Sequence, residues 1–190
     1  SGNSNTAIGS YSLASNTTAE QNTAVGSNTL QANTTGATNV AIGRNALTAN
    51  TTAANNVAVG YCSLVTNTTG STNTALGTET LKANTTGDRN VAIGHTALTA
   101  NVDGCRMVAI GQGALSTNTT GDFSVGIGYA ALAVNTASSH VAIGCGALGA
   151  NTTAACNVVV GHTAGSDVTT GKENVFVGGG AGGGTITTGC

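Results

Sequence analysis

Charged side chains are scarce in this chain of 190 residues, since only 6% are Asp, Glu, Lys or Arg and the formal net charge is −2. A phosphate-binding surface needs clustered lysine and arginine, but the five basic residues are scattered, so we expect no nucleic-acid partner. Disordered chains usually carry a high net charge, which this chain lacks. No apolar run approaches the roughly 18 residues of a membrane-spanning helix, so we expect no membrane span in this segment.

Motifs for catalysis and for cofactors are also missing. There is no Cys-x-x-Cys pair, which argues against a zinc site. The glycine run that begins at Gly178 is not followed by the Lys-Ser/Thr of a phosphate-binding loop. The seven acidic residues form no recurring pair, and no Ser-His-Asp arrangement recurs. We therefore expect no enzyme, no cofactor and no metal site.

The main feature of the sequence is a seventeen-residue repeat, and the chain is rich in glycine and contains no proline. Its anchor is Asn-(Val/Thr)-Ala-(Ile/Val/Leu)-Gly, and successive anchor glycines are seventeen positions apart in nine of the ten intervals and sixteen apart in one. A short, strict period indicates stacked coils that contact only their neighbours. We expect an all-β parallel β-solenoid of eleven coils. The anchor glycines are Gly9, Gly26, Gly43, Gly60, Gly77, Gly94, Gly111, Gly128, Gly144, Gly161 and Gly178.

The facing of each coil can be predicted by numbering the repeat from its Asn as position 1. Positions 2 and 4 are mostly β-branched, which predicts a strand with these two side chains inward and position 3 outward. Position 9 is Leu in nine coils. Thr at position 13 is replaced by Val102 and Ile186, and Thr at position 14 by Asp103 and Ala137. This pattern predicts a second strand with positions 9, 11 and 13 inward and positions 10, 12 and 14 outward.

The small residues at position 3 suggest an interface between copies of the chain. None of them is polar, and an apolar outer ladder in so polar a chain indicates a second buried face. We therefore expect identical chains to pack side by side in a closed ring. The expected interface residues are Ala24, Ala41, Ala58, Ala75, Ala92, Ala109 and Ala142.

The asparagines of seven Asn-Thr-Thr sequons can be interpreted in two ways. If position 12 faces outward, these asparagines could carry glycans. Alternatively, they could form a side-chain ladder that hydrogen-bonds the turn backbone. The seven residues are Asn16, Asn33, Asn50, Asn67, Asn84, Asn118 and Asn151.

Variable residues at positions 6 and 7 are the candidates for surface contacts with a saccharide or a protein receptor, although they could equally be ordinary solvated positions. The five cysteines could be free thiols or could bridge chains. The three histidines could be surface residues or could meet as metal ligands at a trimer axis. The candidate contact residues are Tyr11, Arg44, Tyr61, His95, Gln112, Tyr129 and His162.

The Asn-Val-Ala-Ile-Gly anchor resembles the head repeats of trimeric autotransporter adhesins, in which each chain forms a left-handed β-roll. The longer form, Asn-Val-Ala-Ile-Gly-x-x-Ala-Leu-x-x-Asn-Thr-Thr-Gly, is similar to repeats of bacteriophage tail fibres and related bacterial surface proteins. This resemblance covers residues 5–190 and implies a homotrimer displayed outside the cell, on a virion or a bacterial surface. Autotransporter head repeats are usually shorter than the repeat of this chain.

The regular coils span residues 5–156, after a leading segment of residues 1–4, and two glycine-richer coils follow over residues 157–190. We expect the whole to be a segment of a longer fibre protein. The leading hypothesis is a non-enzymatic trimeric shaft or head of a phage tail fibre or an adhesin. One alternative is a self-assembling, glycosylated extracellular filament. Another is ice binding through outward ladders of Asn at position 12 and Thr at position 14.

Overall fold

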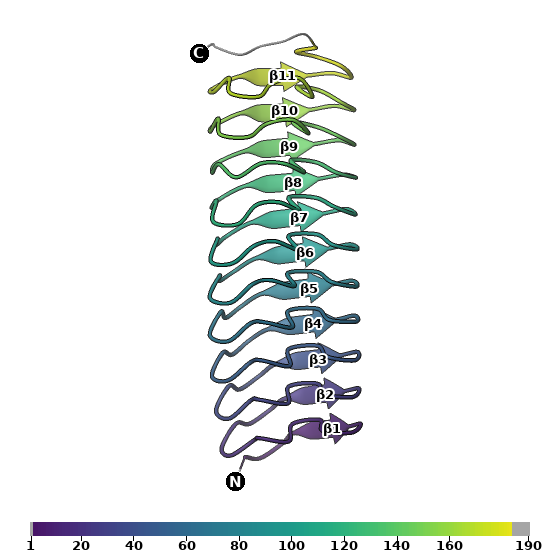
Figure 1. Cartoon of the computed structure of the whole chain (residues 1–190), viewed down its shortest axis with the longest axis vertical. Coiled ribbons are helices and arrows are strands. Elements are labelled where there is room, and N and C mark those ends of the chain that lie inside the picture. The colour runs from purple at the N-terminus through teal and green to yellow at the C-terminus, as the bar shows by residue number, and fades with distance from the viewer. Residues whose placement is uncertain (1, 184–190) are drawn as a thin grey trace.

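The chain forms a rod of stacked coils with one short strand in each coil (Figure 1). The computed structural model describes residues 2–183, so the end of the expected glycine-richer coils lies outside the described residues. The strands pair in parallel, in sequence order, into one eleven-stranded sheet, and no helix occurs within the described residues. The expectation of an all-β parallel solenoid is confirmed. The strands are β1 (Thr6–Ile8), β2 (Thr23–Val25), β3 (Val40–Ile42), β4 (Val57–Val59), β5 (Thr74–Leu76), β6 (Val91–Ile93), β7 (Val108–Ile110), β8 (Val125–Ile127), β9 (Val141–Ile143), β10 (Val158–Val160) and β11 (Val175–Val177).

The expected second strand does not form, and turns occupy the rest of each coil. Positions 7, 9 and 17 have positive φ, for example 62° at Asn45, 51° at Leu47 and 61° at Asn55. A strand needs negative φ, so the strict alternation of inward and outward side chains ends with the anchor glycine. The turns still hydrogen-bond from coil to coil: the N–H of Leu47 donates to the carbonyl of Ser63 over 3.1 Å.

The expected facing of the strand is reversed. The leucines at position 9 point inward as expected, and Leu30 through Leu148 have no exposed surface. The alanines at position 3 from Ala24 to Ala142 are just as buried, whereas Val and Ile at positions 2 and 4 face outward. The limited space inside the coil explains why the small residues of position 3 face inward, because a Cβ placed on Gly126, at position 3, would lie only 3.3 Å from the side chain of Leu115. The interior therefore accepts Ala opposite Leu and rejects a larger pair.

This reversal makes the expected subunit interface wrong. Those side chains already lie inside a single chain with no exposed surface, so no second chain can reach them. They are Ala24, Ala41, Ala58, Ala75, Ala92, Ala109 and Ala142.

Two ladders of asparagine are also buried inside the rod, at positions 1 and 12. At position 1, Asn39 donates from its side chain to Oδ1 of Asn22 over 3.1 Å and to the carbonyl of Ala53 over 2.9 Å. At position 12, Asn50 donates to Oδ1 of Asn33 over 2.9 Å and to the same Ala53 carbonyl over 3.0 Å. Both ladders thus converge on the position-15 carbonyl and satisfy the backbone of that corner.

Position 12 was expected to face outward, and this expectation is wrong as well. The side-chain nitrogen that would carry a glycan is enclosed in the coil, which leaves the alternative of a ladder that bonds the turn. Asn16 is half-buried, and the remaining sequon asparagines have no exposed surface: Asn33, Asn50, Asn67, Asn84, Asn118 and Asn151.

Candidate interaction surfaces

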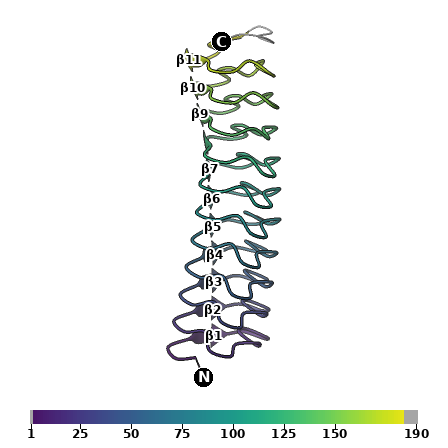
Figure 2. The same cartoon turned by 90° about the vertical axis from the view of Figure 1, so that its left-hand side faces the viewer.

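The strands lie along one side of the rod (Figure 2). Their outward residues make an apolar surface that we call the sheet face. It consists of positions 2 and 4 of every coil. Ile42 is 39% exposed and Ile143 is 38% exposed in the single chain. Three threonines, Thr6, Thr23 and Thr74, are its only polar members, and it contains no charge. Its apolar members are Ile8, Val25, Val40, Ile42, Val57, Val59, Leu76, Val91, Ile93, Val108, Ile110, Val125, Ile127, Val141, Ile143, Val158, Val160, Val175 and Val177.

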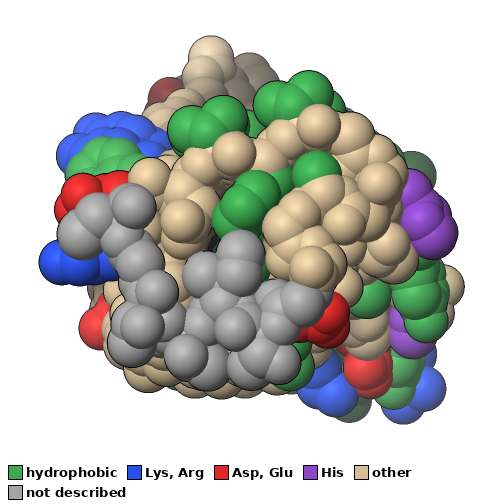
Figure 3. Space-filling view, turned by 90° about the horizontal axis from the view of Figure 1, so that it is seen from above, with side chains coloured by type: hydrophobic (Ala, Val, Ile, Leu, Met, Phe, Trp, Pro, Cys, Tyr) green, Lys and Arg blue, Asp and Glu red, His purple; other side chains and the backbone are tan. Residues whose placement is uncertain are grey.

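Two columns of exposed residues border the sheet face. We call the residue two before each strand the leading rim (position 17) and the residue two after each strand the trailing rim (position 6). Viewed along the rod axis, histidine side chains gather on one side, and acidic and basic side chains occur on both sides (Figure 3).

The trailing rim carries most of the candidate contact residues, and their expected outward facing is confirmed. A role in binding remains a prediction for all of them. Tyr11, at position 7 of the first coil, is exposed, and so are Arg44, Tyr61, His95, Gln112, Tyr129 and His162.

Sequence reasoning missed the leading rim as a place of functional interest. Phe123 is 53% exposed there, and the guanidinium of Arg106 lies 5.3 Å from the centroid of its ring. Arg89 lies one coil before Arg106 in the same column. The signal was available, because two of the five basic residues and one of the two Phe share position 17 in consecutive coils.

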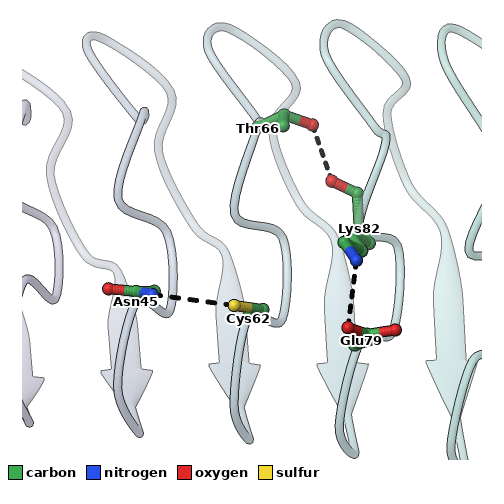
Figure 4. A network of polar contacts seen from close by, with 5 residues as sticks. All are labelled: Asn45, Cys62, Thr66, Glu79 and Lys82. Atoms are coloured by element: carbon green, nitrogen blue, oxygen red, sulfur yellow. Dashed lines mark hydrogen bonds and ion pairs between the residues drawn. The ribbon is translucent and has the colours of Figure 1, made fainter.

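Polar contacts near the trailing rim occur both within a coil and between neighbouring coils (Figure 4). Nδ2 of Asn45 donates to Sγ of Cys62 over 3.7 Å. Lys82 forms an ion pair with Glu79 at 3.0 Å, and the hydrogen bond and charge of that carboxylate raise the pKa of Lys82. The hydroxyl of Thr66 donates to the carbonyl of Lys82 over 2.6 Å. The ion pair lies at the surface and adds little stability, and the three contacts bring no catalytic set together.

His140 interrupts the position-1 asparagine ladder and is fully buried. Its Nδ1 accepts a hydrogen bond from the backbone N–H of Asn157 over 3.3 Å, which requires a neutral ring. Burial lowers the pKa of His140, and the nearby carbonyl of Ala154 partly offsets this effect. The histidine therefore acts as a neutral substitute for asparagine within the ladder.

Acid is expected to destabilise the rod through His140, and His140→Asn should remove this effect. The unfolded chain takes up a proton below a pH of about 6.5, whereas the folded ring resists protonation, so stability falls as the pH drops below that value. Between pH 7.5 and pH 5.5 we expect a loss of about 1 kcal/mol in urea unfolding, absent in His140→Asn. The exposed His95→Asn serves as the control, and an identical pH dependence in all three proteins would contradict the assignment.

Enclosed sites are absent from the part of the chain that the structure describes. Residues 2–183 contain no pocket and no group of three His, Cys, Asp or Glu placed to hold a metal ion. No helix among these residues is long and apolar enough to cross a membrane. The outward Asn ladder required for ice binding does not exist, because position 12 is buried. Comparison of the chain with protein-family models, with curated proteins and with solved structures found no match.

Proposed function

We propose that this chain is a non-enzymatic structural and adhesive element of an extracellular fibre, and that three copies pack side by side through the sheet face. The continuous apolar sheet face is the observation that carries the proposal. Large exposed apolar patches on soluble proteins mark sites of association. In a chain with only 6% charged residues, a face without any charge runs the length of the rod.

The size of this surface favours a ring over a simple face-to-face pair. Eleven strands at about 4.8 Å span about 50 Å, and a three-residue strand is about 10 Å long, so the sheet face alone covers about 500 Å². A stable interface buries about 800 Å² per partner. Including both rims widens the contact to about 20 Å and its area to about 1,000 Å². A closed ring uses both rims, because each copy meets two neighbours.

A rotation axis parallel to the rod keeps every coil of one copy level with the same coil of the next. The same contact is then repeated in each coil, which suits a surface with a seventeen-residue period. The resemblance of the anchor motif to trimeric adhesins and tail fibres supplies the number three and the location on a virion or bacterial surface. In such a ring the outer parts of the rims remain available to a saccharide or protein receptor.

Charges placed on the sheet face test this proposal. Ile93→Lys with Ile110→Lys should abolish the trimer in native mass spectrometry, since buried, unpaired ammonium groups are strongly unfavourable. The matched control is Thr99→Lys with Ser116→Lys, which adds the same charges to the same coils at position 10, where Lys82 occurs naturally. We expect the control to remain trimeric and both double variants to retain the circular dichroism of the parent. An unchanged trimer mass in the Ile variant would refute assembly through the sheet face.

A further inference from the structure

Two exposed cysteines flank the sheet face at opposite rims of adjacent strands. Cys145 lies two residues after the end of β9, and Cys156 lies two residues before the start of β10. Both are exposed free thiols, whereas Cys62 is buried and Cys105 is half-buried. They differ from the other described cysteines in lying where a neighbouring chain of the ring would pass.

A single chain cannot join these two thiols. His162 lies directly above Cys145 in the trailing rim, and it follows Cys156 by six positions, across β10. An extended segment of that length spans about 20 Å. A disulfide requires Cα atoms within about 7 Å of each other.

We infer that Cys145 of one copy and Cys156 of the next form a disulfide, so that the ring is closed covalently. This inference rests on the side-by-side assembly proposed above. Three sheet faces that surround an axis parallel to the rods place the leading rim of each copy beside the trailing rim of its neighbour. Height along the rod is conserved by that rotation, so only residues at nearly equal height can pair.

The heights of the two cysteines meet this condition. Cys156 follows Cys145 by eleven positions within a seventeen-residue coil. At about 4.8 Å per coil, this corresponds to an offset of about 3 Å along the rod. Such an offset is compatible with the usual Cα separation of about 5.5 Å in a disulfide.

Other residues at matching heights on the two rims complement one another. The carboxylate of Glu79, next to the trailing rim, stands level with Arg89 on the leading rim. Glu79 and Arg89 lie ten positions apart within one coil, almost the same spacing as that of the two cysteines, so an opposite-charge pair accompanies the cysteine pair in the same register and supports this orientation of the rims.

The reaction needs an oxidant, for which a low-molecular-weight disulfide suffices. The thiolate of one cysteine attacks a sulfur of that disulfide, releases one small thiol and forms a mixed disulfide. The thiolate of the other cysteine then attacks the protein sulfur of the mixed disulfide and displaces the second small thiol. Two protein thiols are oxidised, one small disulfide is reduced to two thiols, and one S–S bond joins two chains.

Oxidation of a variant that keeps only Cys145 and Cys156 tests the pairing. Cys62, Cys105 and Cys190, the last of which lies outside the described residues, are replaced by Ser. The oligomer is first weighed by native mass spectrometry under reducing conditions. Oxidised glutathione is then added, free thiols are blocked, and the chains are separated in denaturant without reductant. We expect a covalent trimer that collapses to monomer with dithiothreitol.

Single substitutions separate this pairing from contacts between identical cysteines. Either Cys145→Ser or Cys156→Ser alone should leave only monomers in the denaturing gel, because each bridge needs one residue of each kind. Co-expression of the two single variants should restore covalent dimers without trimers. Covalent dimers formed by a single variant on its own would overturn the inference. A native trimer that never becomes covalent would overturn the bridge but leave the fibre proposal standing, and the absence of any native oligomer would overturn both.

Discussion

Leu98→Asp is expected to unfold the middle of the rod, whereas Thr99→Asp should be nearly silent. Leu98 has no exposed surface, while Thr99 is half-buried on the outer side of the same turn. A carboxylate in the apolar interior costs several kcal/mol or must take up a proton, but a charge at the surface changes stability by about 0.5 kcal/mol or less. Thermal unfolding followed by circular dichroism measures the difference.

The backbone does not confound this comparison. Leu98 has a φ of 51°, a conformation that Asp adopts more readily than Leu, so any loss of stability comes from burial of the carboxylate. Equal melting temperatures for the two variants would show that position 9 does not face the interior.

Gly94→Ala should be about as damaging, for a reason of backbone geometry. Gly94 has a φ of +121°, and a Cβ there would lie 2.8 Å from the carbonyl carbon of Gly111 in the next coil. Strain of the backbone and overlap with the neighbouring coil together cost about 4 kcal/mol. Chemical denaturation, with hydrogen exchange to locate the opened coils, provides the measurement.

Gly113→Ala is the matched control for that substitution. Gly113 also has a positive φ, of +68°, but a Cβ there would meet nothing within 4 Å. Ala130 occupies the equivalent position of the next coil with a φ of 52°. We expect a loss of about 1 kcal/mol. If Gly113→Ala were as destabilising as Gly94→Ala, close stacking of the anchor glycines would not be the cause.

The period alone sufficed to predict the solenoid, because a short repeat that places glycine in every coil leaves few other ways to bury a polar backbone. The inward facing of the leucines also followed from sequence. The facing of the strand did not follow, since β-branched residues at positions 2 and 4 predict a strand but do not show which of its two faces is inward. The interior already holds a Leu from the opposite wall, and that Leu leaves room only for Ala.

A compensating change in the last two coils could have shown the true facing. Position 3 grows from Ala to Val159 and Phe176, while position 9 shrinks from Leu to Gly165 and Gly182. The Phe176 ring fills the space that the missing leucine side chains leave, and lies 2.8 Å from where a Cβ on Gly182 would be. Residues that exchange volume in this way must share one interior.

The buried asparagines could have been recognised by their substitutes. Met107 stands in place of Asn at position 1, and Val168 does so at position 12; both are fully buried. An apolar residue at a repeat position that is otherwise Asn indicates that the position is buried, since Met is not favoured over Asn at an exposed position. The sequence alone could not show that the two rims border a single contact surface. That conclusion depends on the strand between them being only three residues long.

The one shortened coil shows which part of the repeat sets the dimensions of the rod. One residue is missing from the corner that follows Ala137, yet β8 and β9 remain in register, with Val125 opposite Val141. Each coil therefore adds the same axial rise whether or not it contains that residue. A gene that gains or loses whole repeats would lengthen or shorten the rod in equal steps of about 4.8 Å. The length of the protein is therefore proportional to its number of repeats.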